Sequence, residues 1–219
     1  MRKMKIFHMK STPIRVHWSL LALLAGLMTW QYTVAGMMPA LSIAAAALCV
    51  FATVFLHELA HVLVAKDFGY NTRSITLYPF GGIARIEMPV EIPPKHELYI
   101  ALAGPLTNAV LSLIFLPLAW FYGSPYGLLV LLNFAMFAFN MLPSYPMDGG
   151  RVMRSLLSRK YGHAKATNIA VVASRFFAWI YFAGGVLLTS PALVMIGAYL
   201  LYLLYYRIKR EIIDSETKS

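Results

Sequence analysis

Residues 40–66 read ALSIAAAALCVFATVFLHELAHVLVAK, a stretch whose first half is almost entirely apolar. A helix needs about 20 apolar residues to cross a bilayer, and this run is long enough. Its second half carries two histidines and a glutamate, in the order His57-Glu58-Leu59-Ala60-His61. Ionisable groups inside such a helix are costly and by default mark function. The stretch therefore predicts a membrane-spanning helix that carries a functional site.

The rest of the chain has the same apolar character. Of 219 residues, 59% are hydrophobic and only 13% are charged, against about 25% in an ordinary soluble domain. No Asp, Glu, Lys or Arg occurs within 16–57, 98–147 or 176–206. We predict an all-α polytopic membrane protein, one membrane-embedded domain over 1–219 with about six spans. The expected spans are 14–35, 40–66, 98–121, 126–142, 166–188 and 192–207.

The net charge of +10 has a pattern that membrane topology explains. Of the 19 basic residues, all but Arg175 fall in the tails or in connections that six spans would place on one side. By the positive-inside rule, that side is cytoplasmic, so both termini are expected in the cytoplasm of a multi-pass cell-membrane protein. No nucleic-acid partner is needed to explain the charge. Arg175 either snorkels toward the cytoplasm or has a buried role.

The only sizeable segment between spans, 67–97, has a strand-like centre. Within 71–88, Ile75 and Leu77 alternate with polar residues, as do Ile86 and Met88, and Gly81–Gly82 interrupts the pattern. Period-two alternation around a glycine pair predicts two short strands joined by a turn, a small β element between the second and third spans. The element either lines a cavity within the protein or is an ordinary surface hairpin.

The two histidines predict a metal site. Positions i and i+4 share one face of a helix, so the imidazoles of His57 and His61 can reach one zinc ion. Glu58 lies beside them without competing as a ligand, and suits a general base that takes a proton from the attacking water. A catalytic zinc site wants three protein ligands and one open position, so a third ligand must come from elsewhere.

The candidates for the third ligand are the remaining acidic residues and histidines near the predicted site. Asp148 is our choice, because the inward-running span at 126–142 ends before a Pro/Gly-rich bend that returns Asp148 to the depth of His57. The glutamates within 87–97 have charged neighbours and look solvated. Two neutral imidazoles, a carboxylate and an ionised Glu58 also balance the charge of Zn²⁺, which eases burial. The others considered are Asp67, Glu87, Glu91, Glu97, His17, His96 and His163.

Two motifs together resemble the site-2 protease family of intramembrane zinc metalloproteases. They are His-Glu-x-x-His at 57–61 and the stretch from Asn140 to Gly150, NMLPSYPMDGG. The segments 103–105 and 77–82 also look like that family's patterns. The resemblance implies one Zn²⁺ held by the two histidines and Asp148, with Glu58 activating water and Asn140 contacting substrate. This chain has no PDZ or CBS regulatory domain, so it looks like a short form.

The predicted function is a zinc metalloendopeptidase that hydrolyses peptide bonds of membrane-associated or transmembrane polypeptides. The expected partners are such a substrate and the lipid bilayer, and a regulatory membrane protein is left open. The alternatives are a membrane metal transporter, a catalytically silent zinc-binding scaffold, or another membrane zincin with a glutamate as third ligand. A transporter would need a polar route through both leaflets, and a scaffold has no use for Glu58.

Several polar residues have simpler structural interpretations. Asn140 and Asn108 could serve only as contacts between helices, and the Ala103–Pro105 segment allows close helix approach and a kink. His17, next to Trp18, is expected to anchor the first span at the membrane interface. The remaining histidines are expected on cytoplasmic surface segments: His8, His96 and His163.

Overall fold

The computed structural model describes residues 3–9, 12–79, 81–89, 92–124 and 126–216. The chain forms two compact units. The first unit comprises Met1–Ile92 and Leu102–Ala138, and the second comprises Pro93–Ala101 and Phe139–Ser219.

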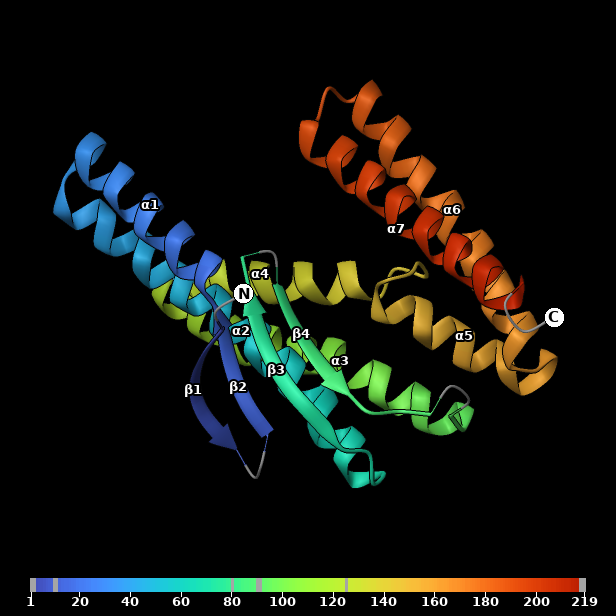
Figure 1. Ribbon diagram of the computed structural model, residues 1–219. Coiled ribbons are helices and arrows are strands. Elements are labelled where there is room, and N and C mark those ends of the chain that lie inside the picture. Colours follow the sequence, from blue (N-terminus) through green and yellow to red (C-terminus); the bar gives the residue numbers. More distant parts are fainter. Residues whose placement is uncertain (1–2, 10–11, 80, 90–91, 125, 217–219) are drawn as a thin grey trace. The chain divides into compact units, whose positions relative to one another are not determined.

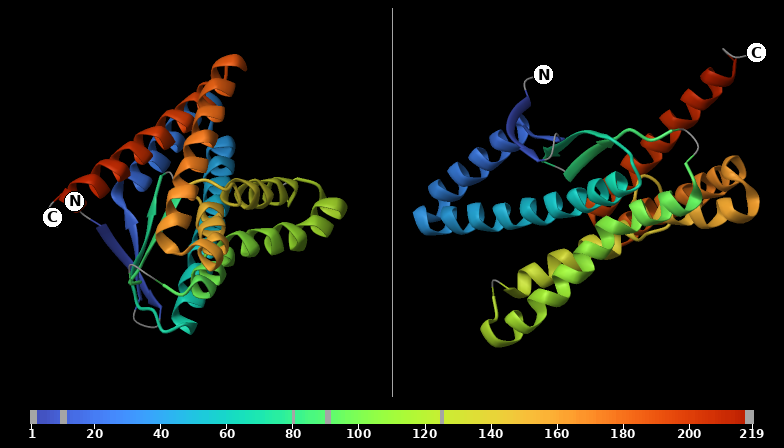
Figure 2. Two further views of the ribbon diagram at one scale, coloured as in Figure 1. Left: turned by 90° about the vertical axis from the view of Figure 1, so that its right-hand side faces the viewer. Right: turned by 90° about the horizontal axis from the view of Figure 1, so that it is seen from below.

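The first unit begins its helical part with a hairpin of two long helices. Helix α1 (Trp18–Ala35) and helix α2 (Met37–Asp67) lie side by side in every view (Figures 1 and 2). Gly36 separates them with a φ of 86°, a left-handed value that side chains rarely adopt, and its N–H caps α1 on the Tyr32 carbonyl. The apolar sequence of 18–67 therefore folds back on itself at a glycine.

A small sheet packs beside this helix pair. It is built from β1 (Lys3–Met9), β2 (Thr12–His17), β3 (Thr72–Tyr78) and β4 (Gly81–Ile86), in the order β1-β2-β3-β4. The predicted hairpin at 71–88 is confirmed as the antiparallel pair β3–β4. Strand β2 runs parallel to β3, with Ile14 opposite Ile75 and Val16 opposite Leu77. The chain is mostly helical with a small sheet, as predicted, but the described sheet has four strands rather than the predicted two, because β1 and β2 join the hairpin.

The sheet also corrects the start of the first predicted span. Residues 14–17 belong to β2, and α1 begins only at Trp18. This strand could not be separated from the span in the sequence, because its apolar residues continue directly into the apolar helix. Pairing with β3 satisfies backbone groups of the strand, while Val16 joins Leu20, Val54 and Leu77 in a buried cluster.

Strand β3 lies in the interior of the sheet and is buried on both faces. Consecutive residues from Ser74 to Leu77 are buried, although the sequence pattern implied that only one face would be. Helix α2 packs against both β3 and β4. Strand β4 keeps the expected alternation, with Ile83 and Arg85 exposed. Strand β3 is therefore part of the unit's core, and β4 lies beside it with half-buried and exposed residues.

The first unit also holds most of α3 (Pro94–Tyr122) and nearly all of α4 (Tyr126–Asn140). A hydrogen bond of 3.1 Å from the Ser112 hydroxyl to the Val130 carbonyl joins the two helices. Asn108 on α3 and Asn133 on α4 are fully buried. Polar contacts of this kind hold helices together where the surroundings are apolar.

The second unit contains α5 (Asp148–Tyr161), α6 (His163–Leu187) and α7 (Pro191–Glu216), together with the first two turns of α3. Helices α6 and α7 form a hairpin (Figure 1) in which Gly185 faces the α7 backbone and Gly197 faces the α6 backbone. The sequence did not predict α5, because that helix carries few apolar residues and buries small polar ones such as Ser155 and Ser158.

Three described helices are long and apolar enough to cross a membrane, namely α2, α3 and α6. Helix α4 and residues 193–206 of α7 are apolar but shorter. Large apolar side chains lie on the outside of these helices, including Leu113, Trp120 and Leu187. An apolar exterior of this size suits lipid rather than water. The structure thus supports a membrane location, with Arg175 on the exposed side of α6.

Candidate metal centre

The two predicted histidine ligands lie one turn apart on α2 and converge. His57 and His61 are each 5% exposed, and their Nε2 atoms are 3.1 Å apart. Two nitrogens bound to one tetrahedral zinc at 2.0–2.1 Å are separated by about 3.3 Å. The pair therefore fits two corners of a zinc site with almost no movement.

The third-span segment 103–105 contributes a glycine that lets α3 approach this pair. A Cβ atom added to Gly104 would lie 2.3 Å from the Nε2 atom of His61 and 2.6 Å from that of His57. A side chain at position 104 would occupy the space in front of the two Nε2 atoms. The glycine therefore keeps the metal-facing side of the two imidazoles open.

One more residue on α3 contacts the histidine pair. The Oδ1 atom of Asn108 is 2.5 Å from Nδ1 of His57. We had expected Asn108 to be a contact between helices, and the structure shows that it also contacts a predicted ligand. Since an amide oxygen can only accept, Nδ1 carries the proton and Nε2 keeps its lone pair.

Glu58 lies on the side of α2 that faces strand β4. Its Oε2 atom accepts a 2.8 Å hydrogen bond from the Ala84 N–H. A Cβ atom added to Gly82 would lie 2.4 Å from the Cγ atom of Glu58, so the strand passes directly over this side chain. The hairpin therefore fixes the orientation of the predicted general base.

Asp148 and Asn140 belong to the second unit. Asp148 is the first residue of α5, is 9% exposed, and has Arg151 Nη1 3.8 Å from its Oδ1. A Cβ atom on Gly149 would lie 2.3 Å from the Leu142 carbonyl oxygen, so only glycine permits this tight turn before the helix. A carboxylate in the first turn is favoured by the helix dipole. Asn140 ends α4 and is half-buried.

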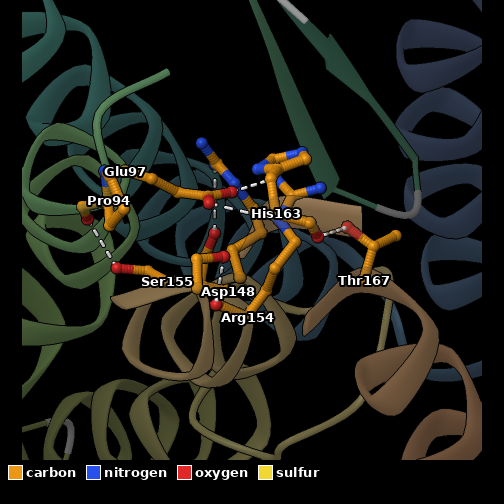
Figure 3. Close-up of polar contacts among 9 residues, drawn as sticks. Pro94, Glu97, Asp148, Arg154, Ser155, His163 and Thr167 are labelled. Carbon is orange, nitrogen blue, oxygen red and sulfur yellow. Dashed lines mark hydrogen bonds and ion pairs between the residues drawn. The ribbon is translucent and has the colours of Figure 1, made fainter. Parts of the chain in front are cut away.

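The remaining acidic candidates have other roles or positions. Asp67 is exposed at the end of α2, and Glu87 forms an exposed ion pair with Arg73. Glu91 lies outside the described residues. Glu97 corrects our expectation that the glutamates of 87–97 are solvated, because it is 1% exposed and paired with Arg154 (Figure 3).

This buried pair ties the start of α3 to α5. Arg154 donates to both oxygens of Glu97, and its guanidinium lies 5.5 Å from the centre of the Tyr145 ring. Beside it, the Ser155 hydroxyl donates to the Pro94 carbonyl at 2.5 Å (Figure 3). Sequence reasoning missed this cluster because its two charges are 57 residues apart.

The other histidines do not join the pair on α2 in the described structure. His17 caps α1 through Ser19 and stacks on Tyr78 with ring centres 5.1 Å apart. His17 is buried, so it does not have the exposed position expected of an interface anchor beside Trp18. Its contacts with Ser19 and Tyr78 instead connect α1 to the sheet. His96 and His163 are half-buried, on α3 and at the start of α6. The side chain of His8 lies outside the described residues.

Comparison with known proteins agrees with this geometry. The family model described as peptidase family M50 matches residues 45–125 and 119–183. The chain therefore belongs to peptidase family M50. The structure is similar to the site-2 protease from Methanocaldococcus jannaschii, with a TM-score of 0.68 and 31% identity over 94% of each chain.

Two curated relatives extend the likeness. A zinc metalloprotease of Methanocaldococcus jannaschii is 37% identical over 158 residues, covering 69% of this chain and 46% of that protein. Stage IV sporulation protein FB of Bacillus subtilis is 29% identical over 149 residues, covering 63% and 50%. The chain thus spans about half the length of these relatives. The family, the name of the first relative and the histidine pair make zinc the cofactor of this site.

Proposed function

We propose that the chain is an intramembrane zinc endopeptidase that hydrolyses peptide bonds of membrane-associated or transmembrane polypeptides. The observation that carries the proposal is the arrangement on α2. Two imidazole Nε2 atoms converge within 3.1 Å, while the neighbouring Glu58 is held by a backbone N–H instead of joining them. A transporter or a silent scaffold needs the histidines but gives no reason to fix an unligated carboxylate beside them.

We further propose that Asp148 is the third zinc ligand. Its carboxylate is of the right type, and a catalytic zinc site needs one protein ligand beyond the two histidines of α2. Its burial supports this role, because a buried carboxylate needs a cation or hydrogen-bond donors. Arg151 lies near one carboxylate oxygen and helps to orient the group.

The chemistry follows from the roles of these side chains. Zinc, when bound, supplies a Lewis acid that polarises the scissile carbonyl and makes water a better nucleophile. Glu58 takes a proton from the attacking water and returns it to the leaving amine, so the carboxylate is regenerated in each cycle. The Ala84 N–H bonds to Oε2, so we assign the proton transfer to Oε1.

The finer membrane arrangement belongs to the same proposal. We infer six spans in one peptidase domain over 1–219, multi-pass in the cell membrane with both termini cytoplasmic. Support comes from the alternation of basic and uncharged connections and from the three long and two shorter apolar helices. The remaining span is α1, which is 18 residues long.

The substrate is proposed to open its helix and pair with β4. A peptide bond inside a helix is shielded, and backbone groups released in lipid need new partners, each unsatisfied one costing several kcal/mol. Strand β3 is flanked by β2 and β4, so it has no edge to offer. Strand β4 is the last strand of the described sheet, and an extended substrate can add there. We propose that Asn140 holds one further backbone group of the substrate.

Metal analysis and a cleavage assay test the proposal together. Purified protein should carry about one zinc, and His57→Ala, His61→Ala or Asp148→Ala should each lose most of it. Glu58→Gln should keep its zinc and lose turnover by about 10²–10⁴-fold, because the base is not a ligand. Normal zinc content in Asp148→Ala would refute the ligand assignment, and full turnover by Glu58→Gln would refute the mechanism.

A further inference from the structure

A chain of buried amides leads from the backbone of α4 to the ligand His57. The Asn133 side-chain nitrogen donates to the Leu129 carbonyl at 2.8 Å, and the Asn108 side-chain nitrogen donates to Asn133 Oδ1 at 3.1 Å. Asn108 Oδ1 then meets His57 Nδ1 at 2.5 Å. Both asparagines are completely buried. Every member of this chain lies in the first unit.

The direction of the chain is fixed at its far end. A backbone carbonyl can only accept, so Asn133 must turn its NH₂ group toward Leu129 and its oxygen toward Asn108. Asn108 must then turn its NH₂ group toward Asn133 and its oxygen toward His57. The imidazole is left with a proton on Nδ1 and a lone pair on Nε2, the atom that faces His61.

The burial of the two amides makes reversal costly. If Asn108 turned over, its oxygen would face the Asn133 oxygen and its NH₂ group would face the Nδ1–H of His57, and each unsatisfied buried group costs about 1–3 kcal/mol. Close packing adds to this constraint, since the Met136 sulfur lies 3.8 Å from the Asn108 nitrogen. The two amides therefore have one favoured orientation, and they hold the His57 ring in a fixed direction.

We propose that Asn108 and Asn133 are positioning residues that hold His57 in the tautomer and ring orientation needed to bind zinc. Outer partners of this type raise the basicity of a histidine ligand and fix its direction. A backbone carbonyl or a carboxylate is the usual acceptor for the second ring N–H of a histidine ligand. Here the acceptor is the side-chain amide of Asn108, and the amide of Asn133 fixes its orientation. The inference rests on the proposed zinc site but does not depend on the proteolytic activity.

The test is the rate of zinc loss from the purified full-length protein to an excess of chelator. Asn108→Leu removes the acceptor with little change in volume and should speed zinc loss about 10–100-fold. Asn108→Asp keeps an acceptor for Nδ1–H but sets a second oxygen against Asn133 Oδ1, and it should lose zinc more slowly than Asn108→Leu. Asn133→Leu frees Asn108 to turn over and should give an intermediate effect.

A matched control separates positioning from packing. Ser112→Ala removes another buried hydrogen bond between α3 and α4 without touching His57, and should leave zinc loss unchanged. The proposal is overturned if Asn108→Leu keeps zinc like the wild type. It also fails if Asn108→Asp loses zinc as fast as Asn108→Leu, or if Ser112→Ala has the same effect. A wild-type protein that holds zinc in this assay but cleaves no substrate would count against the proposed protease alone.

Discussion

The Oε2 atom of Glu58 accepts a 2.8 Å hydrogen bond from the Ala84 N–H, which joins the middle of α2 to a strand 26 residues further along. Ala84 lies in β4 opposite Ile75 of β3, so the bond fixes the carboxylate of the proposed base to the sheet.

Replacing Ala84 with proline should weaken catalysis while leaving the metal in place. Proline has no N–H, and the lost bond to a charged group is worth about 1.5–3 kcal/mol, or roughly a tenfold or greater loss of turnover. Cleavage rate and zinc content are measured on the same preparation. Ala84→Gly keeps the N–H and serves as the control. Unchanged turnover in Ala84→Pro would mean that this contact does not orient the base.

Replacing Gly104 with alanine should abolish zinc binding. The added methyl group would lie 2.3 Å from the Nε2 atom of His61, so it would fill the space that the metal needs. Gly26→Ala is the control, because a Cβ atom there meets none of the described atoms within 4 Å. Metal analysis of both variants checks the prediction. Full zinc content in Gly104→Ala would show that α3 moves freely away from the histidines.

Breaking the buried Glu97–Arg154 pair should destabilise the protein strongly. Removing one partner of a buried ion pair costs about 3–5 kcal/mol, because the remaining charge is left uncompensated. The exposed Arg73–Glu87 pair provides the comparison, and Arg73→Ala should cost at most about 1 kcal/mol. Thermal unfolding of Glu97→Gln and Arg73→Ala in the same detergent measures the difference. Equal midpoints for the two variants would contradict the structural role of Glu97.

The proposed topology predicts the side on which each connection lies. Reporter fusions at Gly36, Ser124 and Ser190 should indicate the outer face, and fusions at Lys95 and Lys160 the cytoplasm. The three outer positions lie in turns without basic residues, and the other two in basic connections. A cytoplasmic signal at Ser124 would contradict the six-span arrangement and the reasoning that brought Asp148 to the depth of His57.

The sequence by itself determined the local features. Charge-free runs predicted the helices, because the free-energy cost of placing a charge in lipid applies to each span on its own. The helical spacing of His57 and His61 predicted their convergence, since a shared helix face depends only on the 3.6-residue period. The alternation at 71–88 predicted the β3–β4 hairpin, because antiparallel strands joined by a short turn are neighbours in the chain.

Only the tertiary structure decided the contacts between distant residues. Three features join residues far apart in sequence. They are the parallel pairing of β2 with β3, the ion pair of Glu97 with Arg154, and the amide chain to His57. No periodic pattern encodes such contacts, because they depend on how closely one helix or strand approaches another. Gly104 illustrates the reason. In sequence it is one glycine in an apolar run, and in the folded protein its missing side chain leaves open the space in front of the two proposed zinc ligands.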